Sequence, residues 1–432
     1  MALVLAMAGL VSACERVDVP GDQANERLAI TNNQAALDGR VNYVEEDVFI
    51  DASARVQPLP RAALLANNYG NGVVRLKVAN VYAKNKKNIR LKLKAYLIPP
   101  QVEGELVQAT AVTVSKDARG AVISYNMRGA PRLGAVDLVT FPKRSRPRLS
   151  STILFSDSDI NSVTADGVQV YAAVATEDPG FTGPAVMERI RIKYDKMILD
   201  DNARVQLSSY AATSAVVTDN AVYATSGDGG HVAAFDRETL AKLGEYPLND
   251  ARWVAWDEQG GRIVVAQGTP GTLSVFEEGV FPGGSMNLIN SFAFPGANIP
   301  ESKSTVAVEG GKAFIAAGTD GVQIMCLDNG QILGSVPRPD PASLGLDPAV
   351  VVTNSVSVDD ELLFISNGEA GVYVARASDE FEDTGCNQNI DLTLLGKLQF
   401  GEQQSVNHVA VIKNYLLIAA GTGGFKIVEV SK

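Results

Sequence analysis

The chain of 432 residues is poor in the side chains that most often carry catalysis or bind metals. It contains only two histidines, His231 and His408, and three cysteines, Cys14, Cys326 and Cys386. It has no His-Glu-x-x-His zinc motif, no Gly-x-Ser-x-Gly nucleophile motif and no cysteine–histidine cluster at metal-binding spacing. The sequence therefore gives no positive indication of an enzyme, and we predict no cofactor and no metal site.

Positive charge is also scarce, because 38 Lys and Arg residues stand against 49 Asp and Glu residues. The resulting net charge of -11 excludes a general nucleic-acid-binding protein, which needs a basic surface. Hydrophobic residues make up 46% of the chain, as in folded globular proteins, and its 39 glycines indicate many tight turns.

The longest apolar run lies at the start of the chain, "MALVLAMAGLVSA" (1–13), and is too short to span a bilayer as a helix. It is typical of the apolar part of a secretory signal peptide. Val11-Ser12-Ala13-Cys14 resembles the lipobox of bacterial lipoproteins, in which the cysteine thiol is linked to diacylglycerol. The resemblance implies lipidation of Cys14 at the cell envelope, and Glu15 after it favours the outer membrane. Ordinary signal cleavage after Ala13 is the alternative.

Two further segments precede the main domain. Residues 14–60 are polar and acidic, and we expect a lipidated N-terminus and flexible tether, of which "YVEEDVFI" (43–50) can pack on the body. Residues 61–108 hold two alternating segments, "VVRLKVANVY" and "NIRLKLKAYLIPP", which predict a basic β-hairpin.

From residue 109 to the end, the chain repeats a unit of about 50 residues. Five segments consist of an apolar run, a Gly-x-x-Gly sequence and a second apolar run. Their first glycines are spaced by 41, 50, 50 and 53 residues: Gly227, Gly268, Gly318, Gly368 and Gly421. Glycine adopts positive φ without a steric clash, so we expect each Gly-x-x-Gly to be the turn of a β-hairpin. Degenerate copies near Gly129 and Gly180 make seven units.

A second marker supports this register. A polar residue precedes a short strand ahead of each hairpin, at spacings of 51, 52, 39, 52, 50 and 53: Thr110, Asn161, Thr213, Arg252, Ser304, Asn354 and Asn407. A fourth apolar strand follows the hairpin, and the pattern contains no convincing amphipathic helix. Four short strands at this period predict an all-β fold, a seven-bladed β-propeller over residues 109–432.

Some of the repeats carry a family resemblance. "GGFKIVEVS", "GVQIMCLD" and "GAVDLVTF" resemble the LVIVD repeat of a family of bacterial, often lipidated, β-propeller proteins. The resemblance covers residues 109–432 and implies the fold and the envelope location. It implies no activity, because what the family binds is largely unestablished.

The last unit ends at Lys432 after its third strand. An open ring would expose a strand edge. We therefore expect one of the two alternating segments within residues 61–108 to supply the missing outer strand and close the ring.

Three groups of residues are candidate sites. The seven polar residues that precede the strands, together with His408, are expected near one mouth of the central channel, either as a ligand-binding ring or as hydrated strand ends. Cys326 and Cys386 lie in neighbouring units and form either a disulfide or two free thiols. Basic residues at alternate positions are expected either to contact an anionic partner or to form a solvated edge: Arg75, Lys77, Lys86, Lys87, Arg90, Lys92 and Lys94.

Two functions follow from these features. The first is a lipid-anchored envelope propeller that acts as a non-enzymatic binding or scaffold protein for an envelope protein or a glycan. The alternative is a propeller hydrolase or lyase that acts on an exported small molecule or glycan at the channel mouth. An enzyme is expected to gather a charged cluster around Arg252, Asn354, Asn407 and His408.

Overall fold

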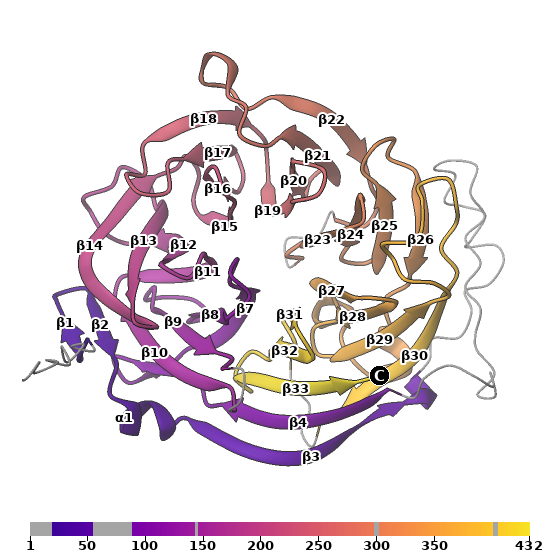
Figure 1. The fold of residues 1–432 in the computed structure, drawn as a ribbon, viewed down its shortest axis with the longest axis horizontal. Coiled ribbons are helices and arrows are strands. Elements are labelled where there is room, and N and C mark those ends of the chain that lie inside the picture. Colours follow the sequence, from indigo (N-terminus) through magenta and orange to yellow (C-terminus); the bar gives the residue numbers. More distant parts are fainter. Residues whose placement is uncertain (1–19, 55–88, 143–145, 298–301, 401–404) are drawn as a thin grey trace, which may run out of the picture.

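The computed structural model describes residues 20–54, 89–142, 146–297, 302–400 and 405–432. Most of the regular structure in these residues is β-strand, arranged in antiparallel sheets. The sheets stand around a common centre, with the first strand of each group nearest to that centre (Figure 1). The prediction of an all-β fold with repeated four-stranded units is confirmed at this level.

Four sheets consist of four consecutive strands and nothing else. The first contains β11 (Ser158–Ala165), β12 (Gln169–Thr176), β13 (Ala185–Lys193) and β14 (Lys196–Gln206). The second contains β15 (Ala212–Val217), β16 (Val222–Ser226), β17 (His231–Phe235) and β18 (Lys242–Pro247). The third contains β19 (Ala251–Asp257), β20 (Arg262–Gln267), β21 (Thr272–Glu277) and β22 (Leu288–Ala293). The fourth contains β23 (Val306–Glu309), β24 (Lys312–Ala316), β25 (Val322–Cys326) and β26 (Ile332–Val336).

Two larger sheets contain strands from the N-terminal part of the chain. The six-stranded sheet contains β7 (Gln108–Val114), β8 (Gly120–Asn126), β9 (Gly134–Thr140), β10 (Arg148–Phe155), β2 (Leu28–Thr31) and β1 (Gln23–Ala24). The nine-stranded sheet contains, in spatial order, β27 (Ser355–Asp359), β28 (Leu362–Ser366), β29 (Val372–Ala377), β30 (Leu392–Gln399), β3 (Val41–Asp51), β4 (Arg90–Leu97), β33 (Phe425–Ser431), β32 (Tyr415–Ala419) and β31 (His408–Ile412). Short elements complete the fold: the hairpin β5 (Gln101–Val102) and β6 (Glu105–Leu106), and the helices α1 (Gln34–Asp38) and α3 (Pro341–Leu344).

The second and third strands of each group are buried between neighbouring sheets. In β12, for example, all eight residues of "QVYAAVAT" are buried. Alanines on such a strand let the flanking sheets approach closely, while Tyr171 fills the remaining space at 0% exposure. This packing explains why the strands have continuous apolar sequences instead of alternating ones.

The Gly-x-x-Gly sequences lie in the turns between second and third strands, as predicted. In three of them both glycines have positive φ: Gly318 and Gly321, Gly368 and Gly371, and Gly421 and Gly424. A Cβ at Gly368 would lie 2.3 Å from the carbonyl oxygen of Val350. Both backbone conformation and space therefore require glycine at that position.

The N-terminal part corrects one expectation. Residues 20–54 belong to the segment that we expected to be a flexible tether, but they form β1, β2, α1 and β3 on the outside of the sheets (Figure 1). The expectation of a flexible tether is therefore wrong for residues 20–54, although residues 43–50, which were expected to pack on the body, do lie within β3. Strand β4 lies within "NIRLKLKAYLIPP" and pairs with both β3 and β33. The other segment proposed as the missing outer strand, "VVRLKVANVY", lies outside the described residues.

Strand β3 also pairs with β30, at Phe49–Gln399, Ile50–Leu398 and Asp51–Lys397. It therefore joins two groups of strands into one sheet. Within the described residues, none of the helices has the length and apolar character needed to cross a membrane.

Candidate functional site: the axial residues and a rim cleft

The seven polar residues expected at the channel mouth make hydrogen bonds between neighbouring sheets. Four of their side chains donate to a backbone oxygen on the innermost strand of the next sheet. These bonds are Thr110 Oγ1 to Ile160 O (3.1 Å), Asn161 Nδ2 to Ala212 O (2.8 Å), Thr213 Oγ1 to Ala251 O (2.7 Å) and Asn407 Nδ2 to Ala109 O (2.8 Å). Each acceptor directly precedes the next polar residue in the series, so the sequence repeat reflects a repeated inter-sheet bond.

A β-bulge explains how three of these side chains, and that of Arg252, are directed towards the next sheet. The pairing register shifts across Thr110, Asn161, Thr213 and Arg252. A bulged residue has no direct partner on the adjacent strand, and the local twist reorients its side chain. The polar residue can then point along the ring instead of into the sheet.

The remaining members of the series are also engaged within the protein. Arg252 pairs with Asp250 at 2.7 Å and donates to the backbone oxygens of Ala297 and Ser302 at 3.0 and 2.9 Å. Ser304 Oγ lies 3.2 Å from Ser302 Oγ. Asn354 Oδ1 accepts a hydrogen bond from the backbone of Lys303 at 3.4 Å.

The hairpin glycines take part in the same contacts between sheets. Isolated antiparallel bridges join Gly318 to Thr353, Gly368 to Val406 and Gly421 to Ala109. Each partner is the residue before a polar member of the series. The geometry therefore favours a structural role for the polar ring over a ligand-binding one, because the hydrogen-bonding groups already hold neighbouring sheets together.

The ring bonds give a first prediction. Thr213→Val keeps the shape of the side chain but removes its bonds to Ala251 O and to Thr225 Oγ1. We expect a loss of about 1–3 kcal/mol in the free energy of unfolding, since the backbone oxygen of the buried residue Ala251 loses this donor. Urea unfolding of Thr213→Val and of the exposed control Thr319→Val measures this difference. An equal, small effect in both variants would show that the ring bonds contribute nothing particular.

Side chains from sheets that are not neighbours meet across the axis. Trp253 of β19 stacks on His408 of β31, with ring centroids 4.9 Å apart. Lys303, which precedes β23, donates from Nζ to the backbone oxygen of Thr110 on β7 at 2.6 Å. Space around the axis is thus occupied by protein side chains at this level.

Burial determines the protonation of these axial groups. It lowers the pKa of His408 to about 3, and the positive charge of Lys303 acts in the same direction. Burial also lowers the pKa of Lys303 to about 8. At neutral pH His408 is therefore an uncharged ring packed on Trp253 and not a protonated acid.

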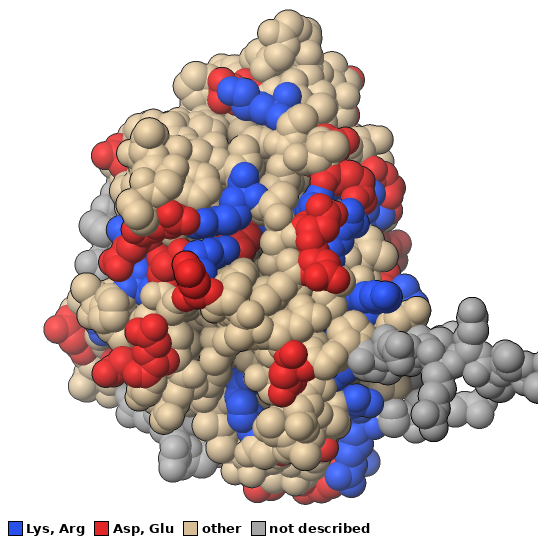
Figure 2. Space-filling model, turned by 90° about the vertical axis from the view of Figure 1, so that its left-hand side faces the viewer, with Lys and Arg blue, Asp and Glu red and all other residues tan. Residues whose placement is uncertain are grey.

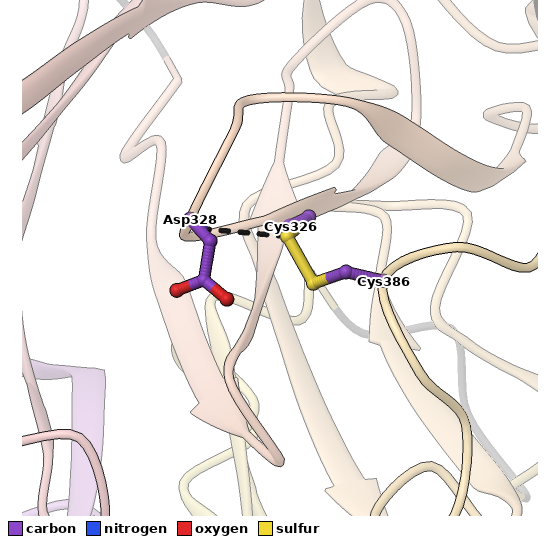
Figure 3. Close-up of side chains that lie close together, drawn as sticks. All are labelled: Cys326, Asp328 and Cys386. Carbon is purple, nitrogen blue, oxygen red and sulfur yellow. Dashed lines mark hydrogen bonds between the residues drawn. A yellow bond between two sulfur atoms is a disulfide. The ribbon is translucent and has the colours of Figure 1, made fainter.

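Cys326 and Cys386, the two cysteines within the described residues, form a disulfide with sulfur atoms 2.08 Å apart (Figure 3). Cys326 ends β25, and Cys386 lies between β29 and β30 in the neighbouring sheet. Asp328 lies beside the bridge and pairs with Arg262 at 2.6 Å. Although these three residues are close together, disulfide sulfurs are not thiolates, and thiolate is the form in which cysteine binds a metal.

This disulfide closes a separation of 60 residues and gives a second prediction. The double variant Cys326→Ser/Cys386→Ser should lose about 2–4 kcal/mol in the free energy of unfolding, because the unfolded chain gains freedom. Unfolding with and without reductant measures the loss. Reductant should lower the free energy of unfolding of the wild type and leave that of the double variant unchanged. If full reduction did not change the free energy of unfolding of the wild type, the prediction would be contradicted.

The basic residues expected to contact an anionic partner lie partly outside the described residues: Arg75, Lys77, Lys86 and Lys87. Arg90, Lys92 and Lys94 lie on β4, next to the acidic strand β3. Lys94 pairs with Glu45 at 2.5 Å and with Glu429 at 3.6 Å. Lys92 lies 3.8 Å from Glu45. Cross-strand acids therefore neutralise much of this charge, which the sequence could not show because β3 and β4 are separated along the chain.

Acidic and basic side chains are similarly interspersed on the flank that carries β14 (Figure 2). Ion pairs there include Arg191 with Asp201 at 2.8 Å and with Glu238 at 2.9 Å. This flank therefore presents mixed charge and no single-sign surface.

A cleft of about 560 Å³ opens at the rim, where β3 and β4 meet loops of the β7–β10 and β31–β33 groups. We call it the rim cleft. Its aromatic lining comes from Tyr43, Phe141 and Tyr415, and the Phe141 and Tyr415 rings lie 5.5 Å apart. Its volume is within the range of small-ligand sites.

The charged lining of the rim cleft is mainly basic. The lining contains three cations, Lys94, Arg146 and Lys413. It contains one carboxylate, that of Glu45, which is already paired with Lys94. The Arg146 guanidinium lies 5.3 Å above the ring of Tyr43. A site with these groups can bind an anion that has some apolar surface.

Most residues of the rim cleft were not identified as site residues from the sequence. They come from β3, β4, the segment after β9 and the β31–β32 turn, which are far apart along the chain. Of its lining, Lys94 was among the basic residues expected to contact an anionic partner. The axial position of Lys303 had no signal in the sequence, because a single lysine in a loop is unremarkable.

No protein-family model matches the chain, and no curated protein matches it. Among solved structures, it is similar to the computationally designed protein Ika8, at 12% sequence identity and a TM-score of 0.45. The match covers 80% of this chain and 94% of the designed chain. A likeness of this strength carries no conclusion about function.

Proposed function

We propose that this protein is a seven-bladed β-propeller, held at the cell envelope by a lipid on Cys14, that acts as a non-enzymatic binding or scaffold protein. Five blades correspond to the strand groups that begin at β7, β11, β15, β19 and β23. The sixth is β27–β30, the seventh is β31–β33 together with β4, and β3 joins the two within the nine-stranded sheet. In this arrangement β4 is the outer strand of the seventh blade, and its pairing with β33 supports ring closure from the N-terminal side.

The observation that carries the binding function is how polar groups are distributed. The ring of polar residues near the axis is used for bonds between sheets, and Trp253 and His408 fill space between them. The rim cleft, in contrast, presents the exposed ring of Tyr43 and the exposed cations Arg146 and Lys413 to solvent. A partner is therefore better accommodated at the rim than at the axis.

The proposed location is supported by the N-terminal sequence, by the repeats and by the disulfide. The apolar run before Cys14 and the lipobox-like residues favour a lipoprotein, and the LVIVD-like repeats favour membership of a family in which lipidation is common. An outer-membrane position, facing the periplasm or the surface, is part of this proposal. A disulfide between Cys326 and Cys386 is compatible with export to an oxidising compartment.

Fractionation of cells that produce wild type or Cys14→Ala tests the anchor. Wild type is expected in the membrane fraction with a mass increase on its N-terminal peptide, and Cys14→Ala in the soluble fraction. The variant Cys326→Ser/Cys386→Ser, which lacks the other two cysteines but keeps Cys14, should remain with the membrane. An unmodified N-terminal Cys14 in wild type would support ordinary signal cleavage instead.

Mass spectrometry of proteins that co-purify with detergent-extracted wild type tests the scaffold function. A stoichiometric envelope partner that is lost from a rim-cleft variant, Tyr43→Ala/Tyr415→Ala, but kept by the ring variant Thr213→Val would support it. A partner lost only when the axial residue Trp253 is changed would contradict it and favour the axial site.

A further inference from the structure

We propose that the rim cleft binds anionic lipid headgroups, so that the anchored protein rests on the membrane by this edge. The inference rests on the proposed lipidation of Cys14 for its biological setting. Its physical basis is the charge of the cleft, its aromatic lining and the place where the N-terminal chain meets the sheets.

Charge is the first argument. In a chain of net charge -11, the rim cleft is lined by three cations and one carboxylate. Glu45 is engaged by Lys94 at 2.5 Å, whereas Arg146 and Lys413 are exposed. Two solvent-facing cations therefore remain in the lining of the cleft, one after β9 and one in the β31–β32 turn. An anionic membrane surface attracts such residues with about 1 kcal/mol each.

The aromatic lining is the second argument. Tyr43 is 37% exposed, and its hydroxyl donates to the backbone oxygen of Pro147 at 3.0 Å, which fixes the ring at the cleft. Tyrosine beside arginine or lysine suits the boundary between headgroups and acyl chains, because the ring is amphipathic and the cation stays among phosphates. Phe141 is only 6% exposed, so Tyr43 and the partly buried Tyr415 are the rings that a headgroup can contact.

The position of the N-terminal chain is the third argument. Asn32 Nδ2 donates to the backbone oxygens of Gly21 and Met197, both at 3.0 Å. Lys196 Nζ donates to the backbone oxygens of Asn32, at 3.1 Å, and of Ser150. The beginning of the described chain therefore lies beside Ser150 on β10.

Ser150 is three residues from Pro147, which lines the rim cleft. Along a strand this is about 10 Å. The first described residue, Pro20, is thus at the same edge of the molecule as the cleft, along the stretch of rim that runs from β1 past α1 to β3 (Figure 1).

Only five residues separate Cys14 from Pro20. A connection of this length spans at most about 20 Å, even when fully extended. A lipid on Cys14 would therefore hold the edge that carries Pro20 and the rim cleft towards the bilayer. The opposite edge of the molecule would point away from the bilayer. Anchor and cleft then have separate effects: the two acyl chains of a diacylglycerol on Cys14 would attach the protein stably, and the cleft would determine which edge rests on the membrane.

Vesicle binding by the full chain carrying Cys14→Ala tests the proposal without any contribution from acylation. Vesicles of phosphatidylcholine alone are compared with vesicles that also contain phosphatidylglycerol. We expect binding that depends on the anionic lipid and falls with added salt. In this background Arg146→Gln and Lys413→Gln should each weaken binding about fivefold, and both together about thirtyfold.

Arg128→Gln is the matched control. Arg128 is also exposed and belongs to the same group of strands, but it lies in the β8–β9 turn, at the other end of β9 from Phe141. We expect the Arg128→Gln variant to bind the anionic vesicles with the same affinity as the parent chain. All variants share one N-terminus, so any affinity that this segment contributes cancels in the comparison.

Several outcomes would overturn the proposal. These are equal loss in Arg128→Gln and Arg146→Gln, undiminished binding by the double variant, or equal binding to vesicles without anionic lipid. Stronger binding of a soluble acidic peptide or oligosaccharide than of vesicles, lost in the double variant, would identify the cleft as a site for that ligand. The fractionation of Cys14→Ala decides lipidation separately, so failure of the anchor and failure of the cleft are distinguishable.

Discussion

Replacing Ala95 by glutamate is expected to prevent stable folding. Ala95 lies at the middle of β4, opposite Tyr43 of β3 and Ile427 of β33, and is 0% exposed. A carboxylate at this position would be buried without a partner, which costs several kcal/mol. Since domains have a stability of only about 5–15 kcal/mol, the loss is a large share of the total.

The measurement is thermal unfolding and soluble yield, with Lys92→Gln as the control on the same strand. The side chain of Lys92 is 47% exposed, so its replacement should change the free energy of unfolding by less than about 1 kcal/mol. If Ala95→Glu were as stable as Lys92→Gln, β4 would not be an inserted strand.

The second large effect is expected for Arg40→Ala. Arg40 donates to both carboxylate oxygens of Asp137, at 2.9 and 2.7 Å, and to Thr152 Oγ1 at 2.8 Å. Asp137 on β9 is 0% exposed. Burial alone would lower the pKa of Arg40, but the negative charge of Asp137 raises it above its ordinary value.

Loss of the guanidinium leaves the Asp137 carboxylate buried without its counter-charge, and we expect a cost of about 3–5 kcal/mol. Chemical unfolding of Arg40→Ala, Asp137→Asn and the double variant gives the coupling energy. The double variant should be more stable than Arg40→Ala. Arg191→Ala, which breaks an exposed pair with Asp201, should cost less than about 1 kcal/mol. Equal effects of Arg40→Ala and Arg191→Ala would contradict the prediction.

Both predictions concern the N-terminal part, which the sequence described poorly. The repeat from residue 109 onwards was readable because glycines and polar residues recur at fixed spacing, and the four-stranded sheets follow it. Residues 20–54 have no such repeat. Arg40 acquires its role from Asp137, 97 residues away, and β3 acquires its role from β4 and β30. Long-range pairing of this kind leaves no local pattern.

The polar series shows a different limit. Its seven positions were identified from the sequence, but their use was not. Asn407 and its acceptor Ala109 are 298 residues apart, and the sequence alone does not show whether an amide faces solvent or a neighbouring sheet. The placement of Asn407 depends on tertiary packing, as do the register shifts at Thr110, Asn161, Thr213 and Arg252.

The rim cleft was less predictable still. Tyr43, Arg146 and Lys413 belong to segments without sequence similarity, and they come together only because β3 lies against β4 at the junction of two strand groups. The composition gives only the net negative charge of the whole chain. It gives no indication that three cations and three aromatic side chains lie together at the rim cleft.

The central claim of this account is that the N-terminal segment completes the last group of strands. Cysteine cross-linking tests it most directly. Lys92 lies directly opposite Glu429 in the β4–β33 pair. In the Cys14→Ala background, Lys92→Cys/Glu429→Cys should oxidise to a disulfide that peptide mass spectrometry identifies, because opposed Cα atoms in antiparallel strands are about 4.5–5.5 Å apart. Lys92→Cys/Lys432→Cys, three residues out of register, should not. A 92–429 bond in the first variant alone would establish the register, and no bond in either would contradict the account.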